Sequence, residues 1–307
     1  MPVPYAMVIV NPVAGSGSTA REWPRIYRQL IAAGLSFNFE FTRGEGQGLE
    51  MARRAADAGY LCLVAVGGDG TVNEIANGIL CSTRPASTLL GLVSCGSTCS
   101  FIRSLGIPRD YGRACCLLTG TGRTTIDVGV VCYHCRGKLL RRFFVNAADV
   151  GLASVIADSW KYLPGGRGRR INHLLRTLAG LRCLGSYQNK ILKLRIGNES
   201  ESILGCNITV ANGQYLGDGM HMAPHAKLDD GLLDIVTAGN LTRFELLKIW
   251  PRLYQGTYLR HSQIKERRAT SVAIESDEPL LVETDGELLG ESPASFSVIP
   301  SALTIVV

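Results

Sequence analysis

Hydrophobic positions in the first part of the chain follow two alternating patterns. Short continuous apolar runs occupy residues 6–10, 37–41, 61–66 and 89–93, and stretches with helical spacing occupy residues 20–33, 48–58, 72–80 and 100–105. Continuous apolar runs are typical of strands that are buried on both faces, and helices join such strands in parallel sheets. The alternation therefore predicts a doubly wound α/β domain, in which helices cover a parallel sheet.

The pattern changes near residues 125–128. Beyond this point, runs rich in Val, Ile and Leu are separated by turns and occupy residues 143–146, 191–196, 203–211, 232–236, 271–275, 280–283, 295–299 and 303–307. Short strands of this kind favour a β-sandwich or a distorted barrel. Since 307 residues exceed the usual size of one domain, we predict an N-terminal α/β domain over residues 1–126 and a C-terminal β-sandwich domain over residues 127–307.

Three features bear on the cellular compartment. The chain runs from Met1 almost directly into an apolar run, without the charged leader and cleavage site of a signal peptide. No apolar run approaches the roughly 20 residues of a spanning helix. Ten cysteines without a secretory signal favour reduced thiols, and Cys132 and Cys135 lack the second pair that a zinc site needs. We therefore expect a cytoplasmic protein that associates with membranes peripherally.

The formal net charge of +6 is concentrated in one segment. Residues 160–195 contain nine Lys and Arg and no acid, so the remainder of the chain carries 6 − 9 = −3. The residues that share one helical face in this segment are Ile171, Leu174, Leu175, Leu178 and Leu181. Either these residues pack on a sheet, or the basic helix and the loop at 164–168 lie on anionic lipid. Nucleic acid is not expected as a partner, because no aromatic residues interleave the basic ones.

A glycine-rich turn links an apolar strand to a helix. The strand 61–66 ends at Gly67-Gly68-Asp69-Gly70-Thr71. Glycines let backbone N–H groups approach an anion, and a helix N-terminus adds positive partial charge, so this turn predicts a phosphate cradle with Thr71 as a helix cap. Asp69 would repel phosphate unless a cation lies between them or it orients a donor, which suggests Mg²⁺, bound directly or through water. An ordinary Asp-Gly turn is the alternative.

The turn resembles the GGDGT signature of the diacylglycerol kinase catalytic family, which also contains sphingosine, ceramide and bacterial lipid kinases. The similarity continues to Gly78 and includes Asn73-Glu74 and Asn77. NAD kinases share only the shorter signature.

Other segments extend this resemblance over nearly the whole chain. Residues 11–15 look like the first nucleotide-binding segment of the family, Thr42 follows the second strand, and residues 95–98 look like its third glycine loop. The resemblance implies nucleotide contacts at Asn11, Pro12, Gly15, Thr42, Gly67, Gly68, Asp69, Gly70, Thr71, Asn73, Glu74, Gly96 and Ser97. Where the family usually has Asn-Asp, this chain has Cys99-Ser100, which keeps a catalytically impaired, lipid-binding pseudokinase as an alternative.

Two acidic turns in the second part complete the resemblance. Residues 226–234 resemble the segment that binds a structural Mg²⁺ in bacterial members, which implies the Asp230 side chain and the carbonyls of Lys227 and Leu232 as ligands. Asp285-Gly286-Glu287 resembles the catalytic DGE of the family. Phosphoryl transfer to an alcohol needs a carboxylate that accepts or orients the hydroxyl proton, and either Asp285 or Glu287 is expected to be that base.

Together these features predict an ATP-dependent lipid kinase, which transfers the γ-phosphate to a lipid hydroxyl of diacylglycerol or sphingoid type at a membrane surface. ATP and Mg²⁺ are the expected cofactors. NAD kinase is an alternative. A dinucleotide-binding oxidoreductase fits GxGxxA at residues 15–20 and Glu40, but it does not account for residues 67–71 or 285–287. Neither glycine loop contains a Walker A Gly-Lys-Ser/Thr. Edge or terminal strands would permit a homodimer without requiring one.

Overall fold

The computed structural model describes residues 5–96, 99–160, 173–217 and 219–307, and it divides into two compact units. Among these residues, unit 1 comprises 5–127 and 301–307, and unit 2 comprises the others up to residue 300. The boundary at Asp127 lies within the interval that the sequence pattern indicated. Within the described residues, no helix is both long enough and apolar enough to cross a bilayer.

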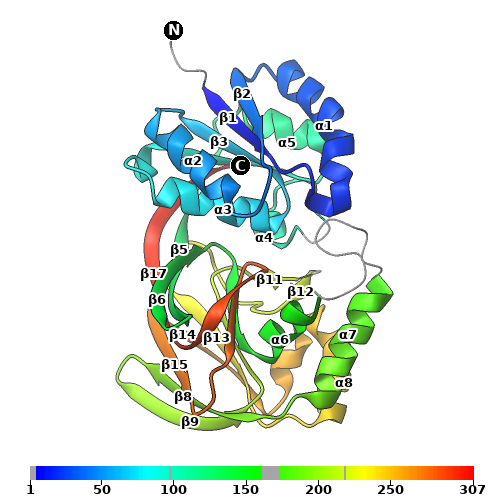
Figure 1. Cartoon of the computed structure of the whole chain (residues 1–307), viewed down its shortest axis with the longest axis vertical. Coiled ribbons are helices and arrows are strands. Elements are labelled where there is room, and N and C mark those ends of the chain that lie inside the picture. The colour runs from blue at the N-terminus through cyan, green and yellow to red at the C-terminus, as the bar shows by residue number, and fades with distance from the viewer. Residues whose placement is uncertain (1–4, 97–98, 161–172, 218) are drawn as a thin grey trace. The chain divides into compact units, whose positions relative to one another are not determined.

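Unit 1 is a parallel sheet between two layers of helices (Figure 1). Its strands are β1 (Ala6–Val10), β2 (Phe37–Phe41), β3 (Cys62–Gly67) and β4 (Leu89–Ser94), in the order β4-β3-β1-β2. The helices are α1 (Ala14–Ala32), α2 (Gln47–Asp57), α3 (Asp69–Leu80), η1 (Pro85–Ser87), α4 (Ser100–Ser104) and α5 (Tyr111–Leu117). Helices α2 and α3 lie on one side of the sheet and α1 and α5 on the other, so the predicted α/β fold is confirmed.

The apolar runs of unit 1 form its core because each strand is covered on both faces. Every residue of β1 and β3 is buried. Trp23, Ile26 and Leu30 project from α1 onto Val8 and Val64 of the sheet. At the start of α1, residues 15–17 have positive φ angles, so the regular helix begins only after this turn.

Unit 2 is β-sandwich-like, as the sequence predicted. One layer has the strand order β14-β13-β10-β7-β16-β17. The strands of the unit are β5 (Arg123–Cys135), β6 (Lys138–Phe144), β7 (Ala147–Gly151), β8 (Lys190–Ile196), β9 (Glu199–Gly205), β10 (Asn207–Ala211), β11 (Tyr215–Leu216), β12 (Met220–His221), β13 (Leu233–Ala238), β14 (Ile264–Ala269), β15 (Ser271–Ser276), β16 (Leu281–Thr284) and β17 (Glu287–Val306). Val150, Val210 and Val282 of this layer pack with Leu194 and Ile274 of β8 and β15.

Helices cover the other face of this layer. They are α6 (Leu152–Ser159), α7 (His173–Ser186), α8 (Arg243–Leu253) and the short η3 (Thr257–Arg260). Ile156, Leu184 and Ile249 of the three longer helices share a core with Val236 of β13. The periodicity of the sequence had indicated only α7, because α6 and α8 carry apolar residues without a clean polar face.

The last residues of the chain join unit 1 in the structure. Residues 301–307 were assigned to the β-sandwich, but Ser301–Val307 belong to unit 1. There the end of β17 pairs in parallel with β4, with Ile305 opposite Leu90. The Ser301 N–H also donates to the Asp127 carboxylate at 2.7 Å. An apolar strand carries no local signal of the sheet that it joins, so the sequence pattern did not reveal this return.

Candidate functional site

The predicted phosphate-binding loops of unit 1 follow the carboxyl ends of four parallel strands. In α/β sheets this edge is where ligands bind. Backbone hydrogen bonds tie the loops to one another: the Asn11 N–H donates to the Val66 carbonyl at 2.9 Å, the Thr42 N–H to that of Val10 at 2.9 Å, and the Cys95 N–H to that of Gly67 at 2.8 Å. Residues far apart in the sequence therefore meet along one edge of the sheet.

The glycines of these loops allow close contact between backbones. A Cβ atom on Gly96 would lie 2.6 Å from the Gly68 Cα, and one on Gly15 would lie 2.2 Å from the Cys95 carbonyl oxygen. Gly15 also has a φ of 58°, which side chains disfavour. Nothing lies within 4 Å of the Cβ position of Gly70. Gly15 and Gly96 are therefore required for packing, whereas Gly70 leaves an open approach to the backbone.

Polar side chains join the loop after β1, the first loop, to the glycine-rich loop after β3, the second loop. Asn11 donates from Nδ2 to the Thr71 hydroxyl at 2.9 Å, and its Oδ1 accepts from the Val13 N–H at 3.2 Å. Gly68 is the N-cap of α3 and makes no side-chain cap. The predicted capping by Thr71 was therefore wrong, because its hydroxyl lies within the first turn and accepts from Asn11 instead.

Asp69 connects the second loop, after β3, to the third loop, which follows β4. Its carboxylate accepts from the backbone N–H groups of Ser100 at 3.0 Å and Phe101 at 3.2 Å, at the start of α4. The sequence suggested that Asp69 either contacts a cation or orients a hydrogen-bond donor. In the structure its carboxylate orients two N–H donors. These donors are backbone groups, so the serine at position 100 does not weaken them.

Cys99 lies immediately before α4 in a left-handed conformation, with a φ of 50°. The Cys99 thiol donates to the Gly96 carbonyl at 2.9 Å. Burial raises the pKa of this thiol above its usual value, so the side chain is a neutral hydrogen-bond donor within the loop. Ser97, a predicted nucleotide contact in the same loop, lies outside the described residues.

The remainder of the extended signature holds α2 against α3. The Glu74 carboxylate accepts from the N–H groups of Gly46 at 2.9 Å and Gly48 at 2.8 Å, at the start of α2. Asn73 is buried and accepts from the Asn77 amide at 3.1 Å. A Cβ on Gly78 would lie 2.4 Å from the Leu49 carbonyl oxygen. The side chains at 73 and 74 thus have partners within unit 1, and their contact with a nucleotide stays a prediction.

The predicted structural Mg²⁺ site in unit 2 contains an arginine. Asp230 accepts from the Leu232 N–H at 3.1 Å. The Arg268 guanidinium lies 3.5 Å from the other Asp230 oxygen and donates from Nε to Asp234 at 3.0 Å. Burial raises the pKa of Asp234, and Arg268 opposes this shift. Arg268 therefore already supplies positive charge beside Asp230, and the ligand roles of Lys227, Asp230 and Leu232 stay predictions.

Within the part of the chain that the structure describes, His, Cys, Asp and Glu form no cluster of three or more that is suited to a metal ion.

Asp285 occupies a tight turn between β16 and β17. Its φ is 49°, and Gly286 follows with a φ of 89°. The carboxylate accepts three consecutive backbone N–H groups, from Val145 at 2.8 Å and from Asn146 and Ala147 at 3.0 Å each. Only 5% of the residue is exposed. Charge-assisted bonds of this kind are about twice as strong as neutral ones, so the carboxylate is rigidly oriented.

Glu287, the second predicted catalytic acid, has a different environment. It forms an ion pair with Arg142, with 2.7 Å between Oε2 and Nη2. Its side chain is 32% exposed, whereas that of Arg142 is 15% exposed. The two acids of the turn therefore differ in their partners: Asp285 is bound by backbone groups and Glu287 by a cation.

Two further buried acids adjoin this turn. Glu283 of β16 lies opposite Asp149 of β7 in the antiparallel register. Asp149 accepts from Asn207 at 2.8 Å and from Thr209 at 2.5 Å, and Glu283 accepts from the Gly286 N–H. Burial raises the pKa of both acids above their usual values, and for Glu283 the neighbouring Asp149 adds to the effect. The sequence signal, an acid inside an apolar run, was present at both positions.

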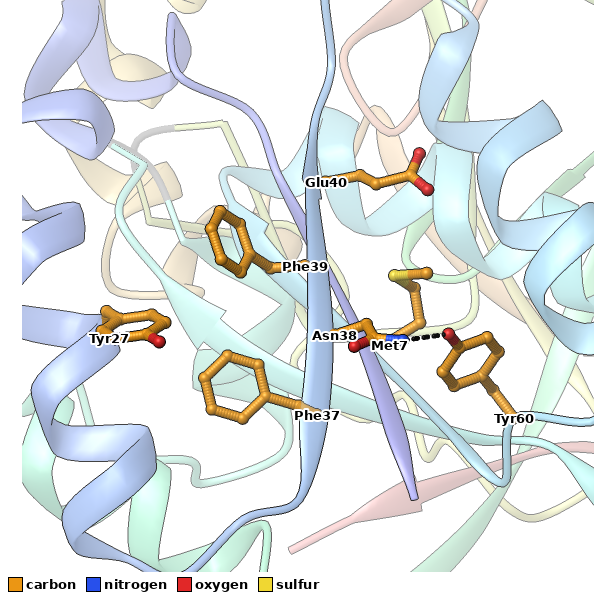
Figure 2. Close-up of a pocket in the computed structure, with 7 residues that line it drawn as sticks. All are labelled: Met7, Tyr27, Phe37, Asn38, Phe39, Glu40 and Tyr60. Carbon is orange, nitrogen blue, oxygen red and sulfur yellow. Dashed lines mark hydrogen bonds between the residues drawn. The ribbon is translucent and has the colours of Figure 1, made fainter. Parts of the chain in front are cut away.

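A surface cavity of about 470 Å³ lies elsewhere in unit 1, on the edge strand β2 (Figure 2). Its lining residues are Met7, Tyr27, Phe37, Asn38, Phe39, Glu40 and Tyr60. Asn38 donates to the Tyr60 hydroxyl at 2.7 Å across it. The lining includes none of the predicted nucleotide contacts, because it follows the length of β2 rather than the carboxyl ends of the strands.

Two family models match the chain. Residues 5–131 match the diacylglycerol kinase catalytic domain. Residues 167–307 match the YegS C-terminal NAD kinase beta sandwich-like domain. The two matches follow the division of the molecule into an α/β part and a β-sandwich-like part.

Curated relatives match along most of their length. A diacylglycerol kinase of Staphylococcus haemolyticus (strain JCSC1435) is 27% identical over 303 residues, which covers 95% of this chain and 84% of that protein. One of Staphylococcus aureus (strain MRSA252) is 29% identical over 299 residues, with coverage of 95% and 88%.

Solved structures share the fold. A crystal structure of a diacylglycerol kinase from Bacillus anthracis str. Sterne has a TM-score of 0.72 at 21% identity and covers 100% of this chain and 97% of its own. A second crystal structure from the same strain has a TM-score of 0.79 at 23% identity, with coverage of 100% and 96%. At these identities the likeness establishes the architecture alone.

Proposed function

Because the chain belongs to the diacylglycerol kinase catalytic-domain family, we propose that it is an ATP-dependent lipid kinase. It transfers the γ-phosphate of ATP to a hydroxyl group of a diacylglycerol or sphingoid-like lipid. The observation that carries this proposal is the set of glycine loops at one edge of the unit 1 sheet, in which Asp69 fixes the third loop to the second.

These loops support phosphate binding through their backbone. Gly68 and Gly96 approach so closely that a Cβ on Gly96 would lie 2.6 Å from the Gly68 Cα. At Gly70, at the start of α3, the approach is open, and the N-terminus of a helix attracts anions. Asp69 remains compatible with an outer role towards a cation, because each carboxylate oxygen has lone pairs beyond those used by two N–H groups.

Mg²⁺, when it is bound with ATP, supplies charge neutralisation at the phosphates. On the protein side, Asp69 would act through water, and Asp230 would serve a separate structural site. The charge of Arg268 beside Asp230 leaves that second site less dependent on a cation. We therefore expect EDTA to abolish turnover. We also expect EDTA to change the melting temperature of the parent more than that of Asp230→Ala. Equal changes in melting temperature would contradict a structural ion at Asp230.

The DGE turn of unit 2 supplies the proposed proton acceptor. The substrate hydroxyl loses its proton as its oxygen bonds to the γ-phosphorus and the bond to the β-phosphate oxygen breaks. Asp285 is the better oriented carboxylate, and Glu287 is the more exposed one. The variants Asp285→Asn and Glu287→Gln show which of the two acids is the base. The fall of kcat at low pH should disappear only in the variant that lacks the base.

A membrane location of the substrate is supported by α7. Two leucines of the predicted apolar face, Leu178 and Leu181, are 51% and 38% exposed, so they are not core residues. Ile171 and the side chain of Leu174 lie outside the described residues, as does the basic loop at 164–168. We propose that this basic segment contacts anionic lipid, and that replacement of Arg182 by Gln weakens sedimentation with anionic vesicles.

Two alternatives rest on specific observations. The second matched family carries NAD kinase in its description, which keeps NAD as a competing acceptor. The Cys99-Ser100 pair keeps a pseudokinase as the other alternative, although the backbone N–H of Ser100 remains bound to Asp69.

The test is phosphate transfer from radiolabelled ATP by the purified full chain. The acceptors are diacylglycerol, a sphingoid base, ceramide, phosphatidylglycerol and NAD, each presented with Mg²⁺. Labelled lipid is the expected result. Label on NAD alone would refute the lipid kinase, and absence of every product would favour a pseudokinase or a lipid-binding protein.

A further inference from the structure

Helix α8 is apolar on two of its faces. One face carries Leu246, Ile249, Trp250 and Leu253, which pack into the core beneath the helices. The opposite side carries Phe244 and Leu247, which are 78% and 45% exposed. A surface helix ordinarily has one apolar stripe and a polar remainder, and a helix that is apolar all round is normally buried. The core accounts for only one face of α8.

The exposed residues form a continuous stripe. Phe244, Leu247 and Pro251 are spaced at i, i+3 and i+7, which places them on one side of the 11-residue helix. Tyr254, the C-cap residue, is 41% exposed and follows at i+10. An apolar stripe of this length is more than a single exposed side chain, which would need no explanation.

The flanks of the stripe are basic. Arg243, Lys248 and Arg252 are all exposed. Glu245 is the acid within α8; it forms a capping box with Thr242, and its carboxylate lies 3.6 Å from a ring nitrogen of His261. A wide apolar stripe between cations is the pattern of helices that lie in the interface of a bilayer. Long basic side chains reach the headgroups while their stems remain apolar.

The position of α8 supports the same partner. Gly180 of α7 packs against Trp250, whose ring would lie 3.0 Å from a Cβ at that glycine, and the two helices run side by side in Figure 1. Helix α7 itself exposes Leu178, Leu181 and the basic Arg182. Self-association through α8 would bring the flanking cations of two copies together, whereas anionic headgroups neutralise them.

We propose that the exposed face of α8, formed by Phe244, Leu247 and Pro251 with Arg243, Lys248 and Arg252, docks on the surface of an anionic membrane. The inference rests on the proposed function in one respect: a lipid kinase must bind a membrane to reach its substrate. Docking through this face is peripheral and reversible, because one short helix buries only a few apolar side chains.

The test compares two exposed leucines of equal accessibility. Leu247→Ser removes a residue of the docking face, and Leu204→Ser on β9 is the control, with 45% and 46% exposure in the parent. Binding is measured by sedimentation of the full chain with vesicles of phosphatidylglycerol and phosphatidylcholine, and with phosphatidylcholine alone. We expect Leu247→Ser to weaken binding to anionic vesicles about tenfold and Leu204→Ser to change it less than twofold.

Two more variants examine the remaining parts of the face. Phe244→Ser is expected to weaken binding by at least as much as Leu247→Ser. The triple change Arg243→Gln, Lys248→Gln and Arg252→Gln is expected to abolish the preference for phosphatidylglycerol. All variants should keep the melting temperature of the parent within a few degrees, because the changed side chains are exposed.

Several outcomes would overturn the proposal. Equal losses in Leu247→Ser and Leu204→Ser would show a general surface effect. A loss in Leu139→Ser, on the β6 strand with 66% exposure, without one in Leu247→Ser would move the contact to the β5–β6 hairpin. Failure of the kinase reaction in the parent would remove the proposed function and leave vesicle binding to be judged alone.

Activity on a short-chain diacylglycerol dispersed in detergent completes the design. Because this substrate requires no bilayer, the α8 variants should retain the parent's turnover on it and lose turnover only on vesicles. A loss on both substrates would show that α8 acts in folding or catalysis, and it would overturn the docking role.

Discussion

The two Asp-Gly turns of the molecule use the same local chemistry in different surroundings. Asp69 in unit 1 and Asp285 in unit 2 each accept hydrogen bonds from consecutive backbone N–H groups. Asp69 is partly exposed and binds two groups at the start of a short helix. Asp285 is buried, binds three, and lies beside Glu283 and Asp149. The first turn preorganises an open loop, whereas the second builds a buried acidic centre.

The largest effect is expected at the buried turn. Asp285→Ala leaves three N–H groups at Val145, Asn146 and Ala147 without their acceptor, and all three residues are buried. At about 1–3 kcal/mol for each unsatisfied group, unfolding by urea should show a loss of at least about 3 kcal/mol, with no turnover. Asp285→Asn retains one oxygen acceptor, so it should be more stable than Asp285→Ala. A stable Asp285→Ala would contradict the comparison.

The same substitution should be milder at the open turn. Asp69→Ala removes the acceptor of the Ser100 and Phe101 N–H groups at the start of α4, so we expect a loss of about 1–2 kcal/mol, as for a helix cap. Turnover should fall by about a hundredfold or more, with a higher KM for ATP, because the third glycine loop is no longer held to the second. Steady-state kinetics at varied ATP concentrations measure both quantities. Unchanged kinetics would mean that Asp69 has no part in nucleotide binding.

Two glycines of the first turn and its helix should respond in opposite ways. Gly78→Ala places a Cβ 2.4 Å from the Leu49 carbonyl oxygen, and such overpacking costs about 1–3 kcal/mol. Gly70→Ala meets nothing within 4 Å, so stability should be kept or raised while ATP binding weakens. Thermal melting and ATP titration of the two variants provide the measurement. Equal destabilisation would show that Gly70 is also a packing residue.

The smallest effect concerns the pH dependence of the buried centre. Burial raises the pKa of Glu283 in the folded chain, with contributions from Asp149 and Asp285, and the Gly286 N–H acts against the shift. An acid that keeps its proton only when folded loses stability as pH rises above its unfolded pKa of about 4.3. Glu283→Gln keeps the acceptor for Gly286 and removes this dependence. It should be more stable than the parent by about 1 kcal/mol at pH 8, and equal at pH 4.

A matched control sharpens that experiment. Glu275 is an exposed acid on β15 of the same unit, so Glu275→Gln should leave the stability profile of the parent unchanged. Urea unfolding between pH 4 and pH 8 compares the three proteins. If Glu283→Gln follows the same decline as the parent, the decline belongs to another group.

The sequence was most informative where the chemistry is local. The strand, the glycines at 67–70 and the start of α3 follow one another directly, so their pattern predicted this turn between a strand and a helix. The acidic turn at 285–287 was recognised by its resemblance to the family motif. By contrast, the sequence offered no means of choosing between a cation and a backbone donor for Asp69, because its partners lie 31 and 32 positions away.

Which apolar side chains are exposed to solvent was similarly difficult to predict from the sequence. The leucines of α7 fitted either a core or a lipid surface, and only the packing of Gly180 and Leu184 inwards shows that Leu178 and Leu181 point out. The two apolar faces of α8 obscured the periodicity that would have identified this helix. A hydrophobic pattern reports that a side chain avoids water, and it does not say which apolar surface covers it.

The sequence by itself indicated the alternation of strands and helices in unit 1, the two-part architecture and the two acidic glycine turns, because each depends on residues that are neighbours in the chain. Tertiary structure decided the return of residues 301–307 to unit 1, the attachment of Glu74 to the start of α2, and the pairing of Glu283 with Asp149. These features depend on strand order and register between distant segments. That register is fixed by packing of the whole chain, which no local pattern contains.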